Sequence, residues 1–507
     1  MTTSEIGILI SIIVYMVAII WIGVYYSKVN NSTEDFYLGG RKLGPFVTAM
    51  SAEASDMSSW LLMGLPGVAY LTGVCNAFWT AVGLGIGTYV NWLIVAKRLR
   101  KYSVICGDAI TVPDFFANRY RDKKVLKCVS ALMIIIFFVP YTASGFAACG
   151  KLFHSLFGVD YMAAMVISAI VIVAYTTLGG FWAASTSDFI QSIVMSVALI
   201  IVIGYGVYSV GGIDVVVSNV KDLPGYINLN ATFDATTNSS SPYGIITIFS
   251  TLAWGLGYFG MPHILLRFMA IEDKNKIKLS RRIASVWVVI AMAVAIFIGV
   301  IGHTMSQVGV IDNLKDSETI IVQIANVLSS HGILFAIIAG VILAGILAST
   351  MSTSDSQLLA ASSSVTENLM DGVLGIKLSE KAKVIVARCT VIGIAIVAIF
   401  LASNPDSSVF QIVSFAWAGF GSTFGPVMLF ALFWKRSNKY GAISGMVAGG
   451  AMVFIWKFVV RPLGGAWDIY ELLPAFIVAC VFIIVISLLT KAPEQEIIDE
   501  FDSVKNA

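Results

Sequence analysis

Charged residues are scarce in this chain. Only 12% of its 507 residues are charged, against roughly 25% in ordinary soluble domains, while 58% are hydrophobic. A composition of this kind excludes a soluble globular protein, because so much apolar surface has to face lipid instead of water. The two longest polar connections, residues 97–125 and 212–243, are too short to form a separate soluble domain.

Several motifs of catalysis and cofactor binding are also missing. The four His residues form no HExxH sequence and no Walker A sequence occurs, so metal-dependent hydrolysis and ATP-driven pumping lack support. The six Cys residues include no CxxC pair, and we interpret them as reduced hydrophobic side chains. One GxGxxG match, at 255–260, lies inside an apolar stretch with no strand before it and Pro262 just after. The chain is therefore expected to be neither a nucleotide-binding protein nor an enzyme.

Long apolar runs are what the sequence does contain. A spanning helix needs about 20 apolar residues to cross a hydrocarbon core of about 30 Å. Such stretches predict an all-α polytopic membrane protein with about 13 transmembrane helices. They lie at 6–26, 45–72, 74–96, 126–149, 160–182, 188–211, 244–270, 283–307, 332–359, 385–403, 408–434, 441–460 and 469–490. The first has neither a charged n-region nor an Ala-x-Ala cleavage site, so we expect a retained helix and not a signal peptide.

The distribution of basic residues predicts the orientation in the membrane. With the N-terminus outside, 26 of the 32 Lys and Arg residues fall in inward loops. Only four fall in outward loops: Lys151, Lys221, Lys315 and Arg461. This asymmetry follows the positive-inside rule and suits an odd number of spans. The C-terminal tail, 491–507, is therefore expected in the cytoplasm.

Three apolar stretches have polar or interrupted centres, at 51–60, 254–262 and 348–356. Interrupted helices in corresponding positions of two halves indicate a transporter site, because unwound backbone offers free carbonyl groups to a cation. Counted along the chain, the second and the seventh apolar stretches are five spans apart. This spacing predicts two inverted five-helix repeats, 45–211 and 244–434, with 6–26 and 441–490 as peripheral helices.

Asp56 lies near the middle of the second stretch. An acid at this depth costs about 2.5 to 3.5 kcal/mol on insertion scales, so a compensating interaction is required. We interpret its carboxylate as helping to bind a cation and a cationic group of the solute; a hydrogen-bonded structural acid is the alternative. Glu53, one turn earlier, would repel Asp56 unless a cation or a proton intervenes.

Hydroxyl groups crowd the ninth stretch, at positions 349, 350, 352, 353, 354 and 356. Sodium is a hard cation that prefers oxygen ligands, which hydroxyl and carbonyl groups supply without excess charge. Close packing of small residues is the alternative, but it does not explain Asp355. In the seventh stretch, the helix break would free Trp254 and Tyr258 to wall a pocket. Asp188 is either an interfacial acid or a buried cation ligand.

Several long strings in the sequence resemble the solute:sodium symporter family, and within it the bacterial members that carry proline. These strings occupy 36–45, 54–58, 60–67, 175–180, 254–260, 262–263 and 416–421. The resemblance implies a leucine-transporter-like fold and sodium-coupled uptake of L-proline across the bacterial cytoplasmic membrane, with sodium as the co-transported ion and no nucleic-acid partner. A sodium- or proton-coupled symporter of another small amino acid or carboxylate is the nearest alternative. A channel would be expected to show a filter segment, and a membrane sensor a cytoplasmic signalling module. Neither is evident in the sequence, so both are less favoured alternatives.

The resemblance also implies the site residues. The main sodium site is expected to comprise the backbone oxygens of Ala54, Met57 and Ser349 and the hydroxyl groups of Ser352 and Thr353. Asp56 is implied as the acid needed for sodium coupling, with Ser58 beside it. The implied proline pocket comprises Asp56, Trp60, Tyr141, Trp254, Tyr258 and Pro262. A possible second cation site comprises Asp188, Asp355 and Ser356, together with Ser352. The chain departs from the family pattern at Glu53, where proline carriers usually have Gly; this acid would admit a proton or favour a more cationic solute.

Overall fold

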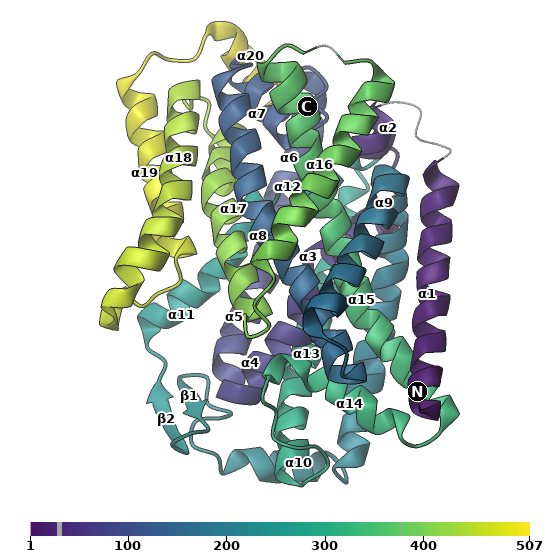
Figure 1. Cartoon of the computed structure of the whole chain (residues 1–507). Helices are drawn as coiled ribbons and strands as arrows, with labels where there is room; N and C mark the ends of the chain where they lie inside the picture. The colour runs from purple at the N-terminus through teal and green to yellow at the C-terminus, as the bar shows by residue number, and fades with distance from the viewer. Residues whose placement is uncertain (1, 28–32, 377, 507) are drawn as a thin grey trace.

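A computed structural model describes residues 2–27, 33–376 and 378–506. Long helices run side by side through the molecule (Figure 1). One end, which we call the hairpin end, carries the strands β1 (Ala231–Asp234) and β2 (Ser239–Pro242) and helix α10 (Ile213–Lys221). The opposite end, which we call the tail end, carries the short helix α7 (Val112–Arg119) and the C-terminal helix α20 (Gln495–Asn506).

The long helices follow the apolar runs of the sequence. They are α1 (Thr3–Ser27), α5 (Val74–Val90), α8 (Val125–Phe157), α9 (Tyr161–Ser209), α13 (Ile277–Gln307), α15 (Ile333–Ser363), α16 (Glu380–Leu401), α17 (Val409–Phe433), α18 (Lys439–Ile455) and α19 (Leu472–Leu489). Gly180 divides α9 into two helices, because its backbone adopts φ 60° and ψ −167°. A side chain at this position would be strained, and glycine is not.

Shorter elements connect and interrupt these helices. They are α2 (Thr33–Leu38), η1 (Gly39–Arg41), α3 (Pro45–Asp56), η2 (Trp60–Gly64), α4 (Leu65–Thr72), η3 (Asn91–Val95), α6 (Ala96–Ile105), α11 (Ile245–Leu252), η4 (Ala253–Gly260), α12 (Pro262–Ala270), η5 (Ser317–Thr319), α14 (Ile320–Ser329), η6 (Ser364–Val373), η7 (Trp456–Val460), η8 (Arg461–Leu463) and η9 (Gly465–Trp467). The antiparallel pair β1–β2 is an addition to the predicted all-α architecture.

The predicted number of thirteen spans is not confirmed. Among the described residues, ten helices are long and apolar enough to cross a membrane, and eleven if the bent pair α11–α12 counts as one span. The two other predicted spans, 45–72 and 160–182, consist of shorter pieces, including the apolar helices Trp60–Thr72 and Tyr161–Thr177. Their interrupted backbones explain why length and composition alone do not count them as spans.

The second predicted span is broken directly after Asp56. Met57 ends α3 with φ −77° and ψ 66°, and Ser58 N–H turns back to the carbonyl of Asp56. The seventh predicted span is broken as well, since α11 passes into the 3₁₀ segment η4 and α12 begins at Pro262 after a bend of 48°. In contrast, α15 is continuous through its hydroxyl-rich centre.

Glycine allows η4 to lie deep in the bundle. A Cβ atom added to Gly255 would collide with the backbone of Gly83 in α5, and one added to Gly257 would collide with the indole of Trp417 in α17. The sequence 254–260 is therefore glycine-rich because η4 packs directly against two neighbouring helices. This places Trp254 and Tyr258 in the interior, where both side chains are buried.

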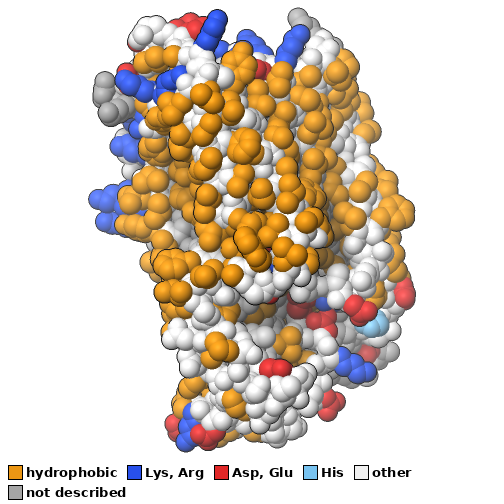
Figure 2. Space-filling view, turned by 90° about the vertical axis from the view of Figure 1, so that its left-hand side faces the viewer, with side chains coloured by type: hydrophobic (Ala, Val, Ile, Leu, Met, Phe, Trp, Pro, Cys, Tyr) orange, Lys and Arg blue, Asp and Glu red, His pale blue; other side chains and the backbone are white. Residues whose placement is uncertain are grey.

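A broad hydrophobic band covers the face shown in Figure 2, with Lys and Arg side chains mainly toward the tail end and acidic side chains mainly below the band. An apolar belt between two polar ends is the surface of a protein that spans a bilayer. Together with its membrane-spanning helices, this identifies a multi-pass membrane protein.

Candidate functional site

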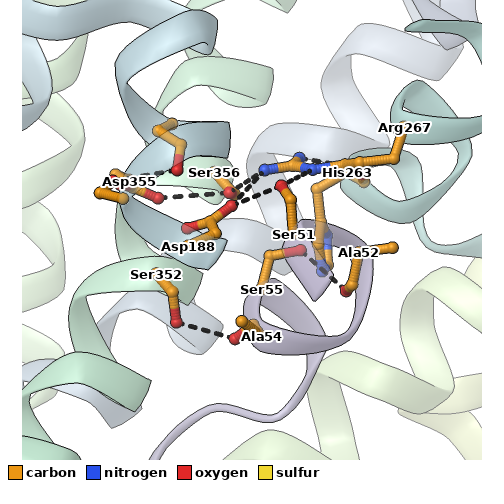
Figure 3. A network of polar contacts seen from close by, with 12 residues as sticks. Ser51, Ala52, Ala54, Ser55, Asp188, His263, Arg267, Ser352, Asp355 and Ser356 are labelled. Atoms are coloured by element: carbon orange, nitrogen blue, oxygen red, sulfur yellow. Dashed lines mark hydrogen bonds and ion pairs between the residues drawn. The ribbon is translucent and has the colours of Figure 1, made fainter. Parts of the chain in front are cut away.

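The broken end of α3 faces the hydroxyl-rich centre of α15. Ser352 Oγ donates a hydrogen bond of 2.7 Å to the carbonyl of Ala54 and lies 3.2 Å from the carbonyl of Ser349 (Figure 3). Thr353 Oγ1 lies 3.1 Å from that same carbonyl of Ser349. The structure therefore brings four of the five predicted sodium ligands together at one buried position.

The fifth predicted ligand, Met57, lies at the break itself. Its N–H still bonds to the carbonyl of Glu53, but its non-helical ψ of 66° turns its own carbonyl away from the helical series. Ser58 follows, and its Oγ accepts a weak hydrogen bond of 3.4 Å from the N–H of Trp60. Neutral carbonyl and hydroxyl oxygens of this kind suit a hard monovalent cation.

Asp56 connects this cluster to aromatic side chains. Tyr258 donates its hydroxyl hydrogen to Oδ2 of Asp56 at 2.5 Å. The backbone carbonyl of Asp56 accepts from the indole N–H of Trp60 at 3.3 Å and from the hydroxyl of Tyr141 at 3.4 Å. Oδ1 of Asp56 is buried and has no hydrogen-bond partner within the described part of the chain. Burying a carboxylate oxygen without a hydrogen-bond partner is unfavourable in free energy, and a bound cationic group would compensate for it.

A cavity of ≈ 860 Å³ opens near the hairpin end and reaches inward to Trp254. Trp254 stacks on Tyr470 at a centroid distance of 5.1 Å, and its ring also lies 6.1 Å from that of Trp60. Because the indole N–H of Trp60 bonds to the carbonyl of Asp56, Trp254 and Trp60 connect the inner end of the cavity to Asp56. Pro262 begins α12 beyond the break, is buried, and does not line this cavity.

Three aromatic neighbours of Trp254 were not predicted. Phe410 and Tyr470 line the cavity, and the indole of Trp417 donates a hydrogen bond of 2.8 Å to the carbonyl of Trp254. Of these, only Trp417 had a sequence signal, because it falls within the string 416–421. Phe410 and Tyr470 belong to segments whose composition does not differ from that of ordinary membrane helices.

The second predicted cation site, around Asp188, already contains a positive group of the chain. Arg267 Nη2 lies 3.1 Å from Oδ2 of Asp188, and Ser51 Oγ donates to the same oxygen at 2.7 Å (Figure 3). Arg267 Nη2 also donates to Ser356 Oγ at 2.5 Å, and Ser356 Oγ donates to Oδ1 of Asp355 at 3.2 Å. Arg267 falls within the predicted span 244–270, and a basic residue inside an apolar span is itself a signal of function.

Glu53, one helical turn before Asp56 in α3, is also buried. Its Oε1 accepts a hydrogen bond of 3.0 Å from the indole of Trp92, and its Oε2 has no partner among the residues that the structure describes. Glu53 and Asp56 interact electrostatically, as expected from their spacing of one helical turn. The chain therefore keeps two acids close together in a water-poor interior.

The sequence profile of the sodium:solute symporter family matches residues 36–449. The chain belongs to the sodium:solute symporter family. It is therefore a transporter and not an enzyme, and the resemblance noted from the sequence strings is confirmed.

Curated relatives within this family match the chain from end to end. The sodium/proline symporter of Haemophilus influenzae is 43% identical over 98% of this chain and 98% of its own length. The osmoregulated proline transporter of Bacillus subtilis is 42% identical, with coverage of 97% and 96%. The sodium/proline symporter of Staphylococcus aureus is 40% identical, with coverage of 98% and 95%.

Solved structures show the same fold at low sequence identity. A Na⁺-coupled sialic acid symporter in a substrate-bound, outward-open state has a TM-score of 0.78 at 16% identity, covering 96% of this chain and 99% of that one. A nucleobase-cation-symport-1 family transporter has a TM-score of 0.54 at 13% identity, covering 93% and 99%. The predicted leucine-transporter-like fold of inverted repeats is confirmed.

Proposed function

We propose that this protein is a sodium-coupled symporter that takes up L-proline across the bacterial cytoplasmic membrane. The observation that carries this proposal is the position of Asp56, whose backbone break supplies oxygens opposite α15 and whose carboxylate accepts the hydroxyl of Tyr258. A cation site and an aromatic chamber therefore share one residue. The names of the relatives that match the full chain support sodium and proline as the transported species.

The proposed sodium ligands are neutral oxygens. They are the backbone oxygens of Ala54, Met57 and Ser349 and the hydroxyl groups of Ser352 and Thr353. Asp56 supplies the negative charge that balances the ion, and Ser58 lies beside it. Because the ligands come from α3 and α15, a bound sodium ion stabilises the arrangement in which these two helices lie together.

The proposed proline pocket is formed by Asp56, Trp60, Tyr141, Trp254 and Tyr258, with Pro262 at its tail-end limit. Aromatic faces suit the pyrrolidine ring and attract its secondary ammonium group. The free Oδ1 of Asp56 is a further acceptor for that ammonium group or for the sodium ion. Trp254 forms the floor of the cavity, so it must move for proline to reach Asp56.

The transport cycle follows from the two ends of the bundle. We assign the hairpin end to the outside and the tail end to the cytoplasm, with the N-terminus outside and the C-terminal tail 491–507 inside. Sodium and proline enter through the cavity. The repeats 45–211 and 244–434 then rotate relative to each other, and sodium and proline leave toward the cytoplasm. The helices 6–26 and 441–490 are peripheral. One charge falling through 100 mV gains about 2.3 kcal/mol, and a tenfold sodium gradient adds about 1.4 kcal/mol.

Uptake of labelled proline into proteoliposomes under imposed ion gradients tests this function. We expect uptake to require an inward sodium gradient and to be faster when the interior is negative. Uptake that is indifferent to sodium rejects the coupling. Sodium-driven uptake of another solute, without competition by proline, rejects the substrate.

Glu53 favours a second candidate, a sodium- or proton-coupled symporter of another small amino acid or carboxylate. An extra buried acid beside Asp56 would suit a proton or a more cationic solute than proline. The same proteoliposomes, given an inward proton gradient without sodium, test the proton-coupled form of this candidate, which alone predicts uptake under those conditions. Sodium-driven uptake of a solute other than proline supports its sodium-coupled form.

A further inference from the structure

All three nitrogens of the Arg267 guanidinium are bound within the bundle. Nε donates to Ser51 Oγ at 3.1 Å, and Nη1 donates to the carbonyl of His263 at 2.9 Å. Nη2 contacts both Asp188 Oδ2 and Ser356 Oγ, at 3.1 and 2.5 Å. Arg267 is only 1% exposed, and the ring of Phe181 lies 5.1 Å from its guanidinium carbon. The charge is thus held in place from several directions.

Two serines extend this single charge to two acids. Ser51 accepts from Arg267 and donates to Asp188, while Ser356 accepts from Arg267 and donates to Asp355 (Figure 3). Both acids are completely or almost completely buried. Because buried carboxylates require a compensating charge, the guanidinium performs the task that a metal ion would otherwise perform at this position.

A second sodium ion does not fit this arrangement. Oδ2 of Asp188 and Oγ of Ser356 already accept hydrogen bonds from Arg267. Oδ1 of Asp188 and Oδ2 of Asp355 have no hydrogen-bond partner among the described residues, but both belong to acids that are already linked to the guanidinium. A sodium ion among them would lie next to a guanidinium in an interior that screens charge poorly, and the two positive charges would repel. The same oxygen types would suit sodium if the guanidinium were absent.

We propose that Arg267 is a tethered cation that takes the place of a second sodium ion beside Asp188 and seals the tail end of the transport path. This inference builds on the proposed sodium coupling. Arg267 lies in α12, whereas the side chains that it contacts, Ser51, Asp188 and Ser356, lie in α3, α9 and α15, so one side chain joins both broken spans to two long helices. It is a positioning residue, since it acts through the helices that it holds together.

The cavities on the two sides of the bundle agree with a seal at this position. The cavity near the hairpin end measures ≈ 860 Å³, whereas the one that Arg267 and Ser356 line measures ≈ 10 Å³. The latter is about the space of one water molecule. Opening the tail end requires α12 to withdraw Arg267 from Asp188, and the charge moves with the chain instead of leaving with the solute.

Equilibrium binding of radioactive sodium to the purified, full-length protein tests the proposal. We expect Arg267→Gln to bind one sodium ion more per molecule than the unmodified protein, because the variant exposes the acceptors on Asp188 and Ser356. The matched double variant, Arg267→Gln with Asp188→Asn, lacks the acid and is expected to lose that additional ion. Arg267→Lys keeps the charge and is expected to bind the same number as the unmodified protein.

An equal sodium count in Arg267→Gln and in the unmodified protein overturns the proposal. If Arg267→Gln does not fold, Asp188→Asn gives an independent answer. We expect Asp188→Asn to bind as many sodium ions as the unmodified protein, and the loss of one ion overturns the proposal. This test compares the sodium counts of two proteins in the absence of solute, so its result does not depend on the proposed function. The proposed function is tested separately, by the absolute number of sodium ions bound and by proline uptake.

Discussion

The hydroxyl group of Tyr258 donates a hydrogen bond of 2.5 Å to Oδ2 of Asp56. This bond joins η4 to the broken end of α3, so the two interrupted spans meet at one carboxylate. Hydrogen bonds to ionised groups are shorter and stronger than those between neutral groups. Any movement that separates η4 from α3 therefore has to break this contact or replace it with a bound ion or solute.

The first prediction concerns the carboxylate of Asp56. We expect Asp56→Asn to abolish sodium-stimulated proline uptake, because the amide retains the shape of the side chain but loses the charge that balances sodium. Asp214→Asn is the control, since Asp214 is an exposed acid of α10, far from α3 in sequence. Normal uptake by the Asp56 variant would remove this residue from the proposed site.

The second prediction concerns the hydroxyl ligands of α15. We expect Ser352→Ala to raise the sodium concentration for half-maximal uptake about tenfold, the effect of roughly 1.4 kcal/mol. Ser354→Ala is the matched control on the same helix, because the Ser354 hydroxyl lies toward Gly145 of α8. Sodium titrations of uptake measure both values. Equal shifts in the two variants would contradict a specific ligand role for Ser352.

The third prediction compares two tyrosines that contact Asp56. Removing a hydrogen bond to an ionised group costs about 1.5 to 3 kcal/mol, which corresponds to about 10- to 100-fold. We therefore expect a loss of this size in kcat/KM for proline from Tyr258→Phe. Tyr141→Phe is expected to lose less, because the hydrogen bond from its hydroxyl to Asp56 is longer, at 3.4 Å, and goes to the neutral backbone carbonyl. The reverse order would show that the carboxylate contact is not the important one.

The fourth prediction concerns the floor of the cavity. We expect Trp254→Ala to raise the KM for proline, because it removes the ring that packs against both Trp60 and Tyr470. Trp254→Phe keeps an aromatic face, so we expect its KM for proline to lie between those of Trp254→Ala and the unmodified protein. Trp467→Ala serves as the control, since that side chain is 53% exposed. An unchanged KM in Trp254→Ala would place the proline pocket elsewhere.

The fifth prediction concerns stability at the hairpin end. Lys151 Nζ lies 2.8 Å from both Asp316 Oδ2 and Glu318 Oε2, and Lys151 and Glu318 are buried. Breaking a buried ion pair from one side costs about 3 to 5 kcal/mol. We therefore expect Lys151→Met to lower the thermal unfolding midpoint clearly. Lys221→Met, at an exposed position of α10, is expected to leave it unchanged.

Local patterns in the sequence were enough to predict much of the fold. Hydropathy located the long helices, the polar centre at 51–60 marked the second span, and glycine with Pro262 marked the break in the seventh, because span length and helix interruption depend on neighbouring residues. The hydroxyl groups near Ser352 stood out by composition alone. The resemblance to the family then supplied expected roles for Ala54, Ser349 and Thr353, and the fold brings these residues to one place.

Only the tertiary structure decided which charges neutralise each other. Arg267 and Asp188 lie 79 positions apart, and no helical or hydropathy period relates a residue of α12 to one of α9. The pairing of Glu53 with Trp92, and the placement of Tyr470 against Trp254, likewise depend on which helix faces meet. The sequence by itself determined where helices form and break, because those are local properties. The bundle determined the partners, because packing between distant segments selects them.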